Sequence, residues 1–173
     1  GYTSAQGDLS VRRAIAEYIA ATHGVKADPD LIYMTCGAAA SLTITLSALC
    51  EKGDEVITFA PFFTEYRVFT ETAGAKLVEL ASDPETFQVD FPRLEKAFTE
   101  KTAAVLVNSP NNPSGVVYSE ETVKKLAALL ARKSAEYGKT IYLVTDEPYR
   151  EIVYDGVKVP YLTAYYKHTV VCY

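Results

Sequence analysis

Three apolar runs typical of buried β-strands end in residues that can bind a ligand. The runs lead into TCGAAAS (35–41), NSPNNPSG (108–115) and TDEPY (145–149). In an open parallel sheet, ligands bind beyond the carboxyl ends of the strands. We therefore expect these three segments to contribute to one site.

Residues 35–41 indicate a phosphate site. Gly37, Ala38 and Ala39 stand at the predicted start of a helix. The N–H groups of a first helical turn have no partners within the helix, and side chains this small leave them open to an anion. The alternative is that small residues only allow the helix to pack closely on the sheet. Neither a G-x-G-x-x-G nor a G-x-x-x-x-G-K-[ST] pattern is present, so dinucleotide and nucleoside triphosphate binding lack their usual motifs.

Residues 145–149 place a carboxylate and a phenol after a buried strand. A carboxylate at such a position loses solvation unless a donor or cation pairs with it. Asp146 can therefore partner a protonated heterocyclic nitrogen, and Tyr149 can donate to a phenolate on the same ring. The alternatives are a helix cap or loop hydrogen bond for Asp146 and a packed aromatic for Tyr149.

Two further segments bear on a flat ligand. In APFFTEY (60–66), the side chain of Phe62, Phe63 or Tyr66 can stack on a ring. In 108–115 the prolines restrict the backbone and Gly115 tolerates positive φ, so turn chemistry can explain the segment. Alternatively, one of its asparagines is directed at the ligand.

The composition excludes several classes of protein. Of the 173 residues, 49% are apolar and 23% charged, as is usual for a soluble globular protein. The net charge of −5 and the lack of a basic block argue against nucleic-acid or anionic-membrane binding. No stretch is apolar enough to span a bilayer, and no signal peptide is visible.

The cysteines and histidines predict neither a metal site nor disulfides. Cys36, Cys50 and Cys172 have no paired spacing, and His23 and His168 are the only histidines. We expect buried free thiols in a reducing compartment, and hence a cytoplasmic protein.

Strand-like and helix-like segments alternate along the chain. Strands are expected at LIYMTCG, EVITFA, KLVEL, TAAVLVN, TIYLVTDEPY and HTVVCY. Helices are expected at 8–24, 38–51, 63–74, 91–98 and from Ser119 to Gly138, the first with an apolar stripe that includes Val11 and Tyr18. This order predicts an α/β fold with a mostly parallel sheet covered by helices on both faces.

Together the segments require a ligand with a phosphate, an aromatic face, a phenolic oxygen and a basic ring nitrogen. Pyridoxal 5′-phosphate (PLP) has all four. The chain resembles the large domain of class I/II aminotransferases, the fold-type I PLP enzymes, from YTSAQGDLSVRRAI through GDEVITFAPFFTEY and NNPSG to TDEPY. The resemblance implies a single truncated PLP-binding large domain over residues 1–173, without the small domain.

The resemblance also implies a role for each matching residue. Gly37, Ala38 and Ala39 match the turn that holds the phosphate through backbone N–H groups, and Phe63 matches the aromatic that stacks on the ring. Tyr2 matches a tyrosine that reaches the phosphate across a homodimer interface.

The remaining matches concern the polar atoms of the cofactor ring. Asp146 matches the aspartate that pairs with the pyridinium nitrogen. Asn112 and Tyr149 match the two donors to the phenolic oxygen, and the resemblance favours a cis Asn112–Pro113 bond.

The Schiff-base lysine of the family follows a strand like HTVVCY, so we expect it beyond Tyr173. We expect the chain to be an inactive piece of a PLP-dependent aminotransferase that moves an amino group between an amino acid and a 2-keto acid. The alternatives are a PLP-dependent C–S lyase on the same fold and a non-catalytic α/β domain that binds a phosphorylated ligand or a partner.

Overall fold

The apolar runs assemble into a five-stranded sheet in a computed structural model that describes residue 2 and residues 4–173. The strands are β1 (Glu55–Ala60), β2 (Lys76–Ala81), β3 (Thr102–Asn108), β4 (Tyr142–Asp146) and β5 (Thr169–Cys172). Their order in the sheet is β2-β1-β3-β4-β5, and every neighbouring pair is parallel. The predicted parallel sheet is confirmed.

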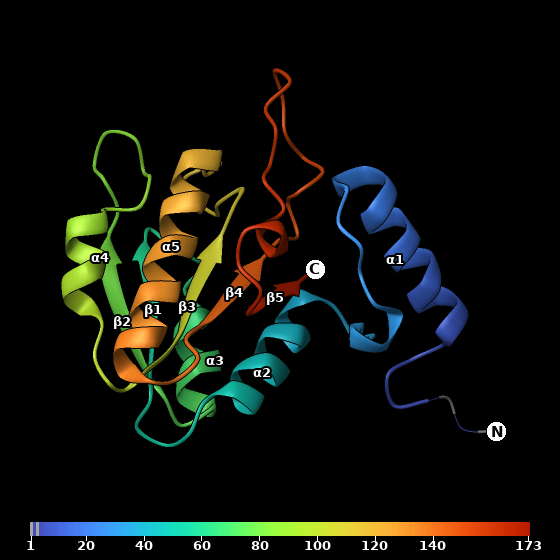
Figure 1. Ribbon diagram of the computed structural model, residues 1–173, viewed down its shortest axis with the longest axis horizontal. Helices are drawn as coiled ribbons and strands as arrows, with labels where there is room; N and C mark the ends of the chain where they lie inside the picture. Colours follow the sequence, from blue (N-terminus) through green and yellow to red (C-terminus); the bar gives the residue numbers. More distant parts are fainter. Residues whose placement is uncertain (1, 3) are drawn as a thin grey trace. The chain divides into compact units, whose positions relative to one another are not determined.

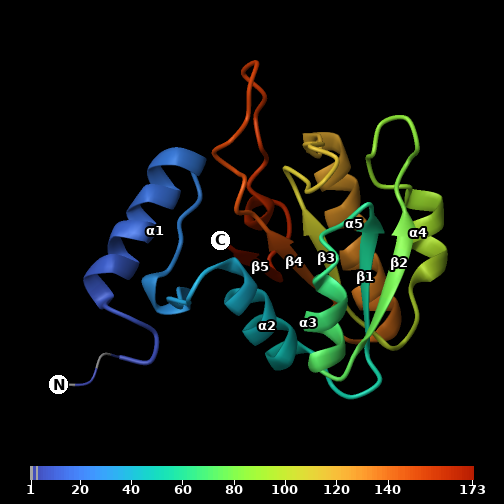
Figure 2. The same ribbon diagram turned by 180° about the vertical axis from the view of Figure 1, so that it is seen from behind.

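Helices cover both faces of this sheet. Helices α4 (Phe91–Ala97) and α5 (Glu120–Tyr137) lie on one face, and α2 (Ala38–Leu49) and α3 (Tyr66–Thr72) lie on the other (Figures 1 and 2). Alternation along β3 explains the two layers: Val105 and Val107 pack with α4 and α5, whereas Ala104 and Leu106 pack with α2 and α3. The fold class predicted from the sequence is confirmed.

The ends of α5 follow the predicted capping chemistry. The Oγ of Ser119 accepts a hydrogen bond of 3.0 Å from the backbone N–H of Thr122. At the other end, Gly138 adopts a left-handed conformation with φ 63°. Local sequence therefore determines where this helix begins and ends.

The chain divides into two compact units, Gly1–Cys36 and Gly37–Tyr173. The first contains α1 (Leu9–His23) and the short 3₁₀ helix η1 (Pro29–Leu31). The second contains the sheet, α2 to α5 and the 3₁₀ helix η2 (Leu162–Ala164).

The helix predicted at 8–24 is confirmed as α1, capped by Asp8 and Gly24, but its apolar stripe is not buried throughout. In α1 the buried residues are Arg12 and Ala16, whereas Val11 and Tyr18 of the predicted stripe are exposed. Arg12 can be buried because its Nη1 donates to the carbonyl of Pro29 at 2.6 Å. An apolar stripe shows which side of a helix is apolar, but it does not show what covers that side.

The prediction of a strand at LIYMTCG (31–37) is wrong, because no strand forms there. Leu31 ends η1, and residues 32–35 are irregular, with Tyr33 and Met34 exposed. A strand needs a neighbouring strand to pair with, and here the N–H of Met34 donates only to the carbonyl of Gln6. Apolar composition alone does not supply that neighbour.

No helix within residues 4–173 has the length and apolar character needed to cross a bilayer.

The central strand should carry much of the stability. Leu106→Ala removes a side chain that is 0% exposed, and we expect it to lower the free energy of unfolding by about 2–5 kcal/mol. Val68→Ala in α3, where the side chain is 58% exposed, should cost less than about 0.5 kcal/mol. Urea unfolding of the full-length protein that contains this chain measures both, and equal losses would contradict the layered core.

Candidate active site

The carboxyl ends of β3 and β4 lie side by side, with Asn108 in register with Asp146. The Nδ2 of Asn108 donates to the carbonyl of Asp146 at 2.8 Å, and its Oδ1 accepts from the N–H of Asn112 at 2.6 Å. Asn108 thus ties the loop after β3 to the end of β4. Turn chemistry therefore accounts for one bond of Asn108, the one from Asn112, whereas its bond to β4 forms only because the sheet brings that partner within reach.

Turn chemistry does account for the middle of this loop. The Oδ1 of Asn111 accepts from the N–H of Ser114 at 3.0 Å and from its hydroxyl at 2.7 Å. Gly115 has φ 74°, and the Asn112–Pro113 bond is cis, as the resemblance predicted. The loop is therefore held from both sides of Asn112.

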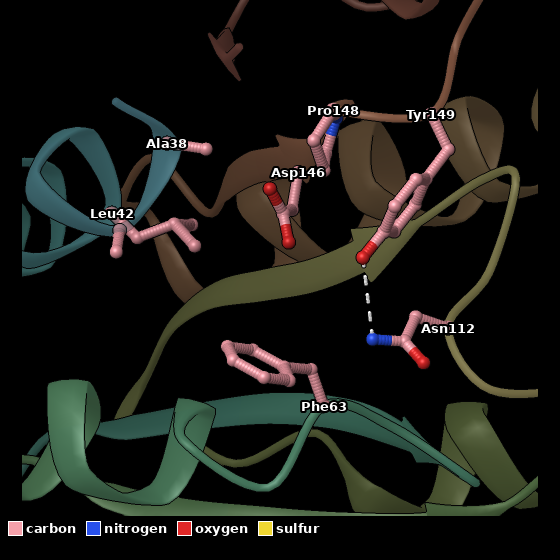
Figure 3. A pocket seen from close by; sticks show the side chains of 8 residues that line it. Ala38, Leu42, Phe63, Asn112, Asp146, Pro148 and Tyr149 are labelled. Carbon is pink, nitrogen blue, oxygen red and sulfur yellow. Dashed lines mark hydrogen bonds between the residues drawn. The ribbon is translucent and has the colours of Figure 1, made fainter. Parts of the chain in front are cut away.

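A pocket of about 90 Å³, here called the strand-end pocket, opens at this edge of the sheet (Figure 3). It is lined by Ala38, Ala39, Leu42, Phe63, Asn112, Asp146, Pro148 and Tyr149. Six of these were predicted as site residues from the sequence. Whole ligand pockets usually measure about 300–1,000 Å³, so these residues enclose only one side of a ligand.

Two predicted site residues do not line the strand-end pocket. Gly37 directly precedes Ala38 and caps α2. Tyr2 belongs to the first unit and is fully exposed. The fold therefore gathers the predicted ring contacts in the second unit and leaves Tyr2 outside it.

Asp146 is the chemically unusual residue of the pocket. Only 5% of its surface is exposed. Its Oδ2 accepts a hydrogen bond of 2.5 Å from the hydroxyl of Tyr66, whereas its buried Oδ1 has no hydrogen-bond partner. A buried acceptor without a donor costs free energy, so this oxygen is suited to receive a donor from a ligand.

The pKa of Asp146 reflects these surroundings. Burial raises it, the hydrogen bond from Tyr66 lowers it, and the neighbouring charge of Glu147 raises it, leaving the pKa above its ordinary value. Burial and the nearby Asp146 raise the pKa of Tyr66 well above its usual range, so Tyr66 remains the donor. A cation beside Oδ1 would favour the ionised carboxylate.

The adjacent carboxylate, Glu147, already has a cation. It is fully buried, and its Oε2 accepts from the Nε of Arg150 at 2.5 Å. Arg150 also donates to the carbonyls of Val159 and Pro160, each at 3.0 Å, and lies over the ring of Tyr161. This pair closes the turn that carries Tyr149 and ties it to the far end of the 147–161 loop.

Two hydrogen-bond donors, Asn112 and Tyr149, meet at another part of the pocket lining. The Nδ2 of Asn112 donates to the hydroxyl of Tyr149 at 3.3 Å (Figure 3). The loop after β3 and the turn after β4 supply one donor each. Both therefore can address a single acceptor on a ligand.

The structure separates the three aromatic candidates of residues 60–66. Phe63 is half-buried and lines the strand-end pocket. Phe62 is not a lining residue, and Tyr66 is fully buried with its ring edge-on to Phe63 at 5.7 Å between centroids. Sequence reasoning treated Tyr66 as a stacking alternative and missed its bond to Asp146, since no local pattern connects α3 with β4.

The small residues at the start of α2 have different surroundings. Gly37 has φ 94°, a backbone conformation that favours glycine, and a Cβ placed there would meet no atom within 4 Å. Ala39 is exposed, and Ala38 is half-buried; both line the strand-end pocket. The phosphate site at residues 37–39 stays a prediction.

The cysteine prediction is partly confirmed. Cys36, Cys50 and Cys172 are free, and Cys172 is buried, but Cys36 is exposed. Among the described residues, no group of three or more His, Cys, Asp or Glu side chains is arranged to hold a metal ion.

Comparison with known proteins identifies the family. The aminotransferase class I and II family model matches residues 1–173. This chain belongs to the class I and II aminotransferase family. A probable aspartate/prephenate aminotransferase from Thermus aquaticus is 35% identical over 170 residues, which are 98% of this chain and 43% of that protein.

Solved aminotransferase structures share the fold. An aminotransferase from Eubacterium rectale superposes with a TM-score of 0.98 at 58% identity, over 100% of this chain and 44% of that one. The aspartate aminotransferase of Thermus thermophilus, solved with maleate, gives 0.87 at 33% identity, over 99% and 44%. The chain thus spans less than half the length of these relatives.

Members of this aminotransferase family depend on PLP, and the described residues fit it. The unpartnered Oδ1 of Asp146 suits a protonated ring nitrogen, and Phe63 offers a ring face. Asn112 and Tyr149 offer two donors, and the start of α2 offers N–H groups for a phosphate. Each fit rests on an atom or surface of the strand-end pocket.

The buried ion pair between Glu147 and Arg150 gives a stability prediction. Arg150→Met leaves Glu147 buried without its cation, and we expect a loss of about 3–5 kcal/mol in the free energy of unfolding. Arg132→Met breaks a pair with Glu95 whose side chains are both about half exposed, and should cost at most about 1 kcal/mol.

Urea unfolding of the full-length protein measures both variants. Adding Glu147→Gln to Arg150→Met removes the unpaired charge and should restore part of the loss. Equal, small effects of the two arginine substitutions would contradict the buried pair.

Proposed function

We propose that the protein containing this chain is a PLP-dependent aminotransferase that transfers an amino group between an amino acid and a 2-keto acid. One observation carries the proposal: Asp146 lines the strand-end pocket and its buried Oδ1 has no hydrogen-bond donor, in a chain of the aminotransferase family. The T. aquaticus and T. thermophilus relatives are named for amino acid substrates, which supports this substrate class.

PLP supplies an electron-withdrawing ring that stabilises negative charge at the substrate Cα. Asp146 holds the proton on the ring nitrogen, because a carboxylate beside that nitrogen raises its pKa. This keeps the ring strongly electron-withdrawing. The lack of any other cation for Asp146 among the described residues is what makes it available for this role.

The other pocket residues would hold the ring in place. Asn112 and Tyr149 would donate to its phenolic oxygen, and Phe63 would stack on one face. The backbone at Gly37, Ala38 and Ala39 would bind the phosphate through N–H groups. All of these contacts come from the edge of one sheet and the helix beside it.

We also propose a homodimer in which Tyr2 of a second copy reaches the phosphate. Two observations support it: Tyr2 is fully exposed, and a set of large apolar side chains is more than half exposed, so that a partner can cover them. They include Ile44 of α2 and Ile152 and Tyr154 of the 147–161 loop. The expected location is the cytoplasm, which the three free thiols support.

A C–S lyase on the same fold uses the same cofactor contacts, so the reaction products must decide between the two. An aminotransferase would yield the keto acid of its amino acid donor together with the amino acid formed from its keto acid acceptor, and no free ammonia. A lyase would yield a thiol, ammonia and a 2-keto acid from a sulfur amino acid and water. Product analysis of the full-length protein with aspartate, alanine and cystathionine separates these outcomes, and failure to bind PLP at all favours a non-catalytic domain.

The role of Asp146 gives a direct test. Asp146→Asn keeps the shape but removes the charge that holds the ring proton, so kcat should fall by about 100-fold or more, as when other single electrostatic stabilisers are removed. The matched control Glu95→Gln neutralises an exposed carboxylate of α4 and should leave kcat unchanged. Steady-state kinetics of the full-length protein measure both, and full activity of Asp146→Asn would refute the assignment.

A further inference from the structure

Tyr66 connects two parts of the strand-end pocket without lining it. It begins α3, is 0% exposed and packs in the layer between the sheet and α2. Its hydroxyl donates to the Oδ2 of Asp146 at 2.5 Å, and its ring lies edge-on to Phe63. One buried side chain thus contacts two residues that line the pocket, Asp146 and Phe63.

A buried tyrosine hydroxyl needs an acceptor, and two other tyrosines of this fold, one buried and one half-buried, use backbone carbonyls. Tyr166 donates to the carbonyl of Ile141 at 2.7 Å, and the half-buried Tyr137 donates to that of Phe98 at 3.1 Å. Tyr66 instead donates to a carboxylate whose second oxygen has no partner. A backbone carbonyl could also accept from the Tyr66 hydroxyl, so the need for an acceptor does not by itself explain the bond to Asp146.

We propose that Tyr66 is a positioning residue: its hydroxyl holds Oδ2 of Asp146 so that Oδ1 is presented to the ring nitrogen of PLP. The inference rests on the proposed function. The rotamer of Asp146 is determined by this bond, because the carbonyl of the same residue, and not its carboxylate, takes the bond from Asn108. Without Tyr66, both carboxylate oxygens would be buried without a donor.

The same hydrogen bond favours the ionised carboxylate. The titratable groups facing Asp146 are Tyr66 from α3, Cys172 from the paired strand β5, and Glu147 and Tyr149 from its own segment. Of these, only Tyr66 lowers the pKa of Asp146, whereas burial and Glu147 raise it. Removing the hydroxyl therefore leaves only influences that raise this pKa.

Tyr66→Phe in the full-length protein tests the proposal through PLP affinity, measured by titrating the cofactor-free protein over a range of pH. A protonated ring nitrogen needs an ionised partner, so affinity falls as the pH drops through the pKa of Asp146. In Tyr66→Phe this fall should begin at higher pH, with affinity about tenfold weaker at neutral pH, the effect of one hydrogen bond to a charged group. The ratio to the unaltered protein should narrow as the pH rises.

Tyr166→Phe is the matched control, because it removes a buried hydroxyl from the opposite face of the sheet. It should leave PLP affinity unchanged at every pH. A second variant, 3-fluorotyrosine at position 66, keeps the packing and makes the hydroxyl a stronger donor, so the fall in affinity should begin at lower pH. It tests the proposal even where Tyr66→Phe does not fold.

Each outcome of these titrations either supports or overturns the positioning role of Tyr66. A pH-dependent loss in Tyr66→Phe, or the opposite shift with fluorotyrosine, supports the positioning role. An affinity ratio that does not vary with pH, or an equal loss in Tyr166→Phe, overturns it while PLP binding by the unaltered protein still upholds the proposed function. No PLP binding by the unaltered protein overturns both.

Discussion

The strand-end pocket depends on one incompletely satisfied carboxylate. Asp146 ends a buried strand, where its charge is costly, and it receives a single hydrogen bond from Tyr66. The second oxygen is buried without a hydrogen-bond partner, and Asp146 lines the pocket. Native proteins seldom leave such a group without a partner, and the structure around Asp146 is arranged so that a ligand can complete it.

Asp146 and Glu147 are consecutive in the sequence, but their side chains have different partners. Side chains alternate across a strand, and Asp146 is directed to the layer of α2 and α3, where Tyr66 lies. Glu147 bonds instead to Thr145 and to Arg150. The carboxylate of Asp146 keeps one oxygen without a donor among the described residues, whereas that of Glu147 pairs with Arg150 and stabilises the turn that carries Tyr149. The distinction follows from which of the two has a cation.

Much of the fold could be predicted from local patterns. The predicted β3 segment TAAVLVN coincides with the observed strand, and Ser119 and Gly138 flank α5 as their capping chemistry indicates. Local patterns failed in the first unit, because the burial of a helix face and the formation of a strand depend on which other segments pack or pair with them. Val11 is exposed although it belongs to an apolar stripe, and Tyr33 lies in no strand although its segment is apolar.

The sequence by itself determined the element order from residue 38 onward, the parallel α/β class and the residue types at the strand ends, because these follow from short-range periodicity, capping and composition. It also carried the resemblance that pointed to PLP. Only the tertiary structure decided which side chains meet: Asn108 bridges β3 to β4, and Tyr66 reaches Asp146 across 80 positions of sequence. Such contacts depend on strand register and on the packing of a helix over the sheet, and neither is encoded in any one segment.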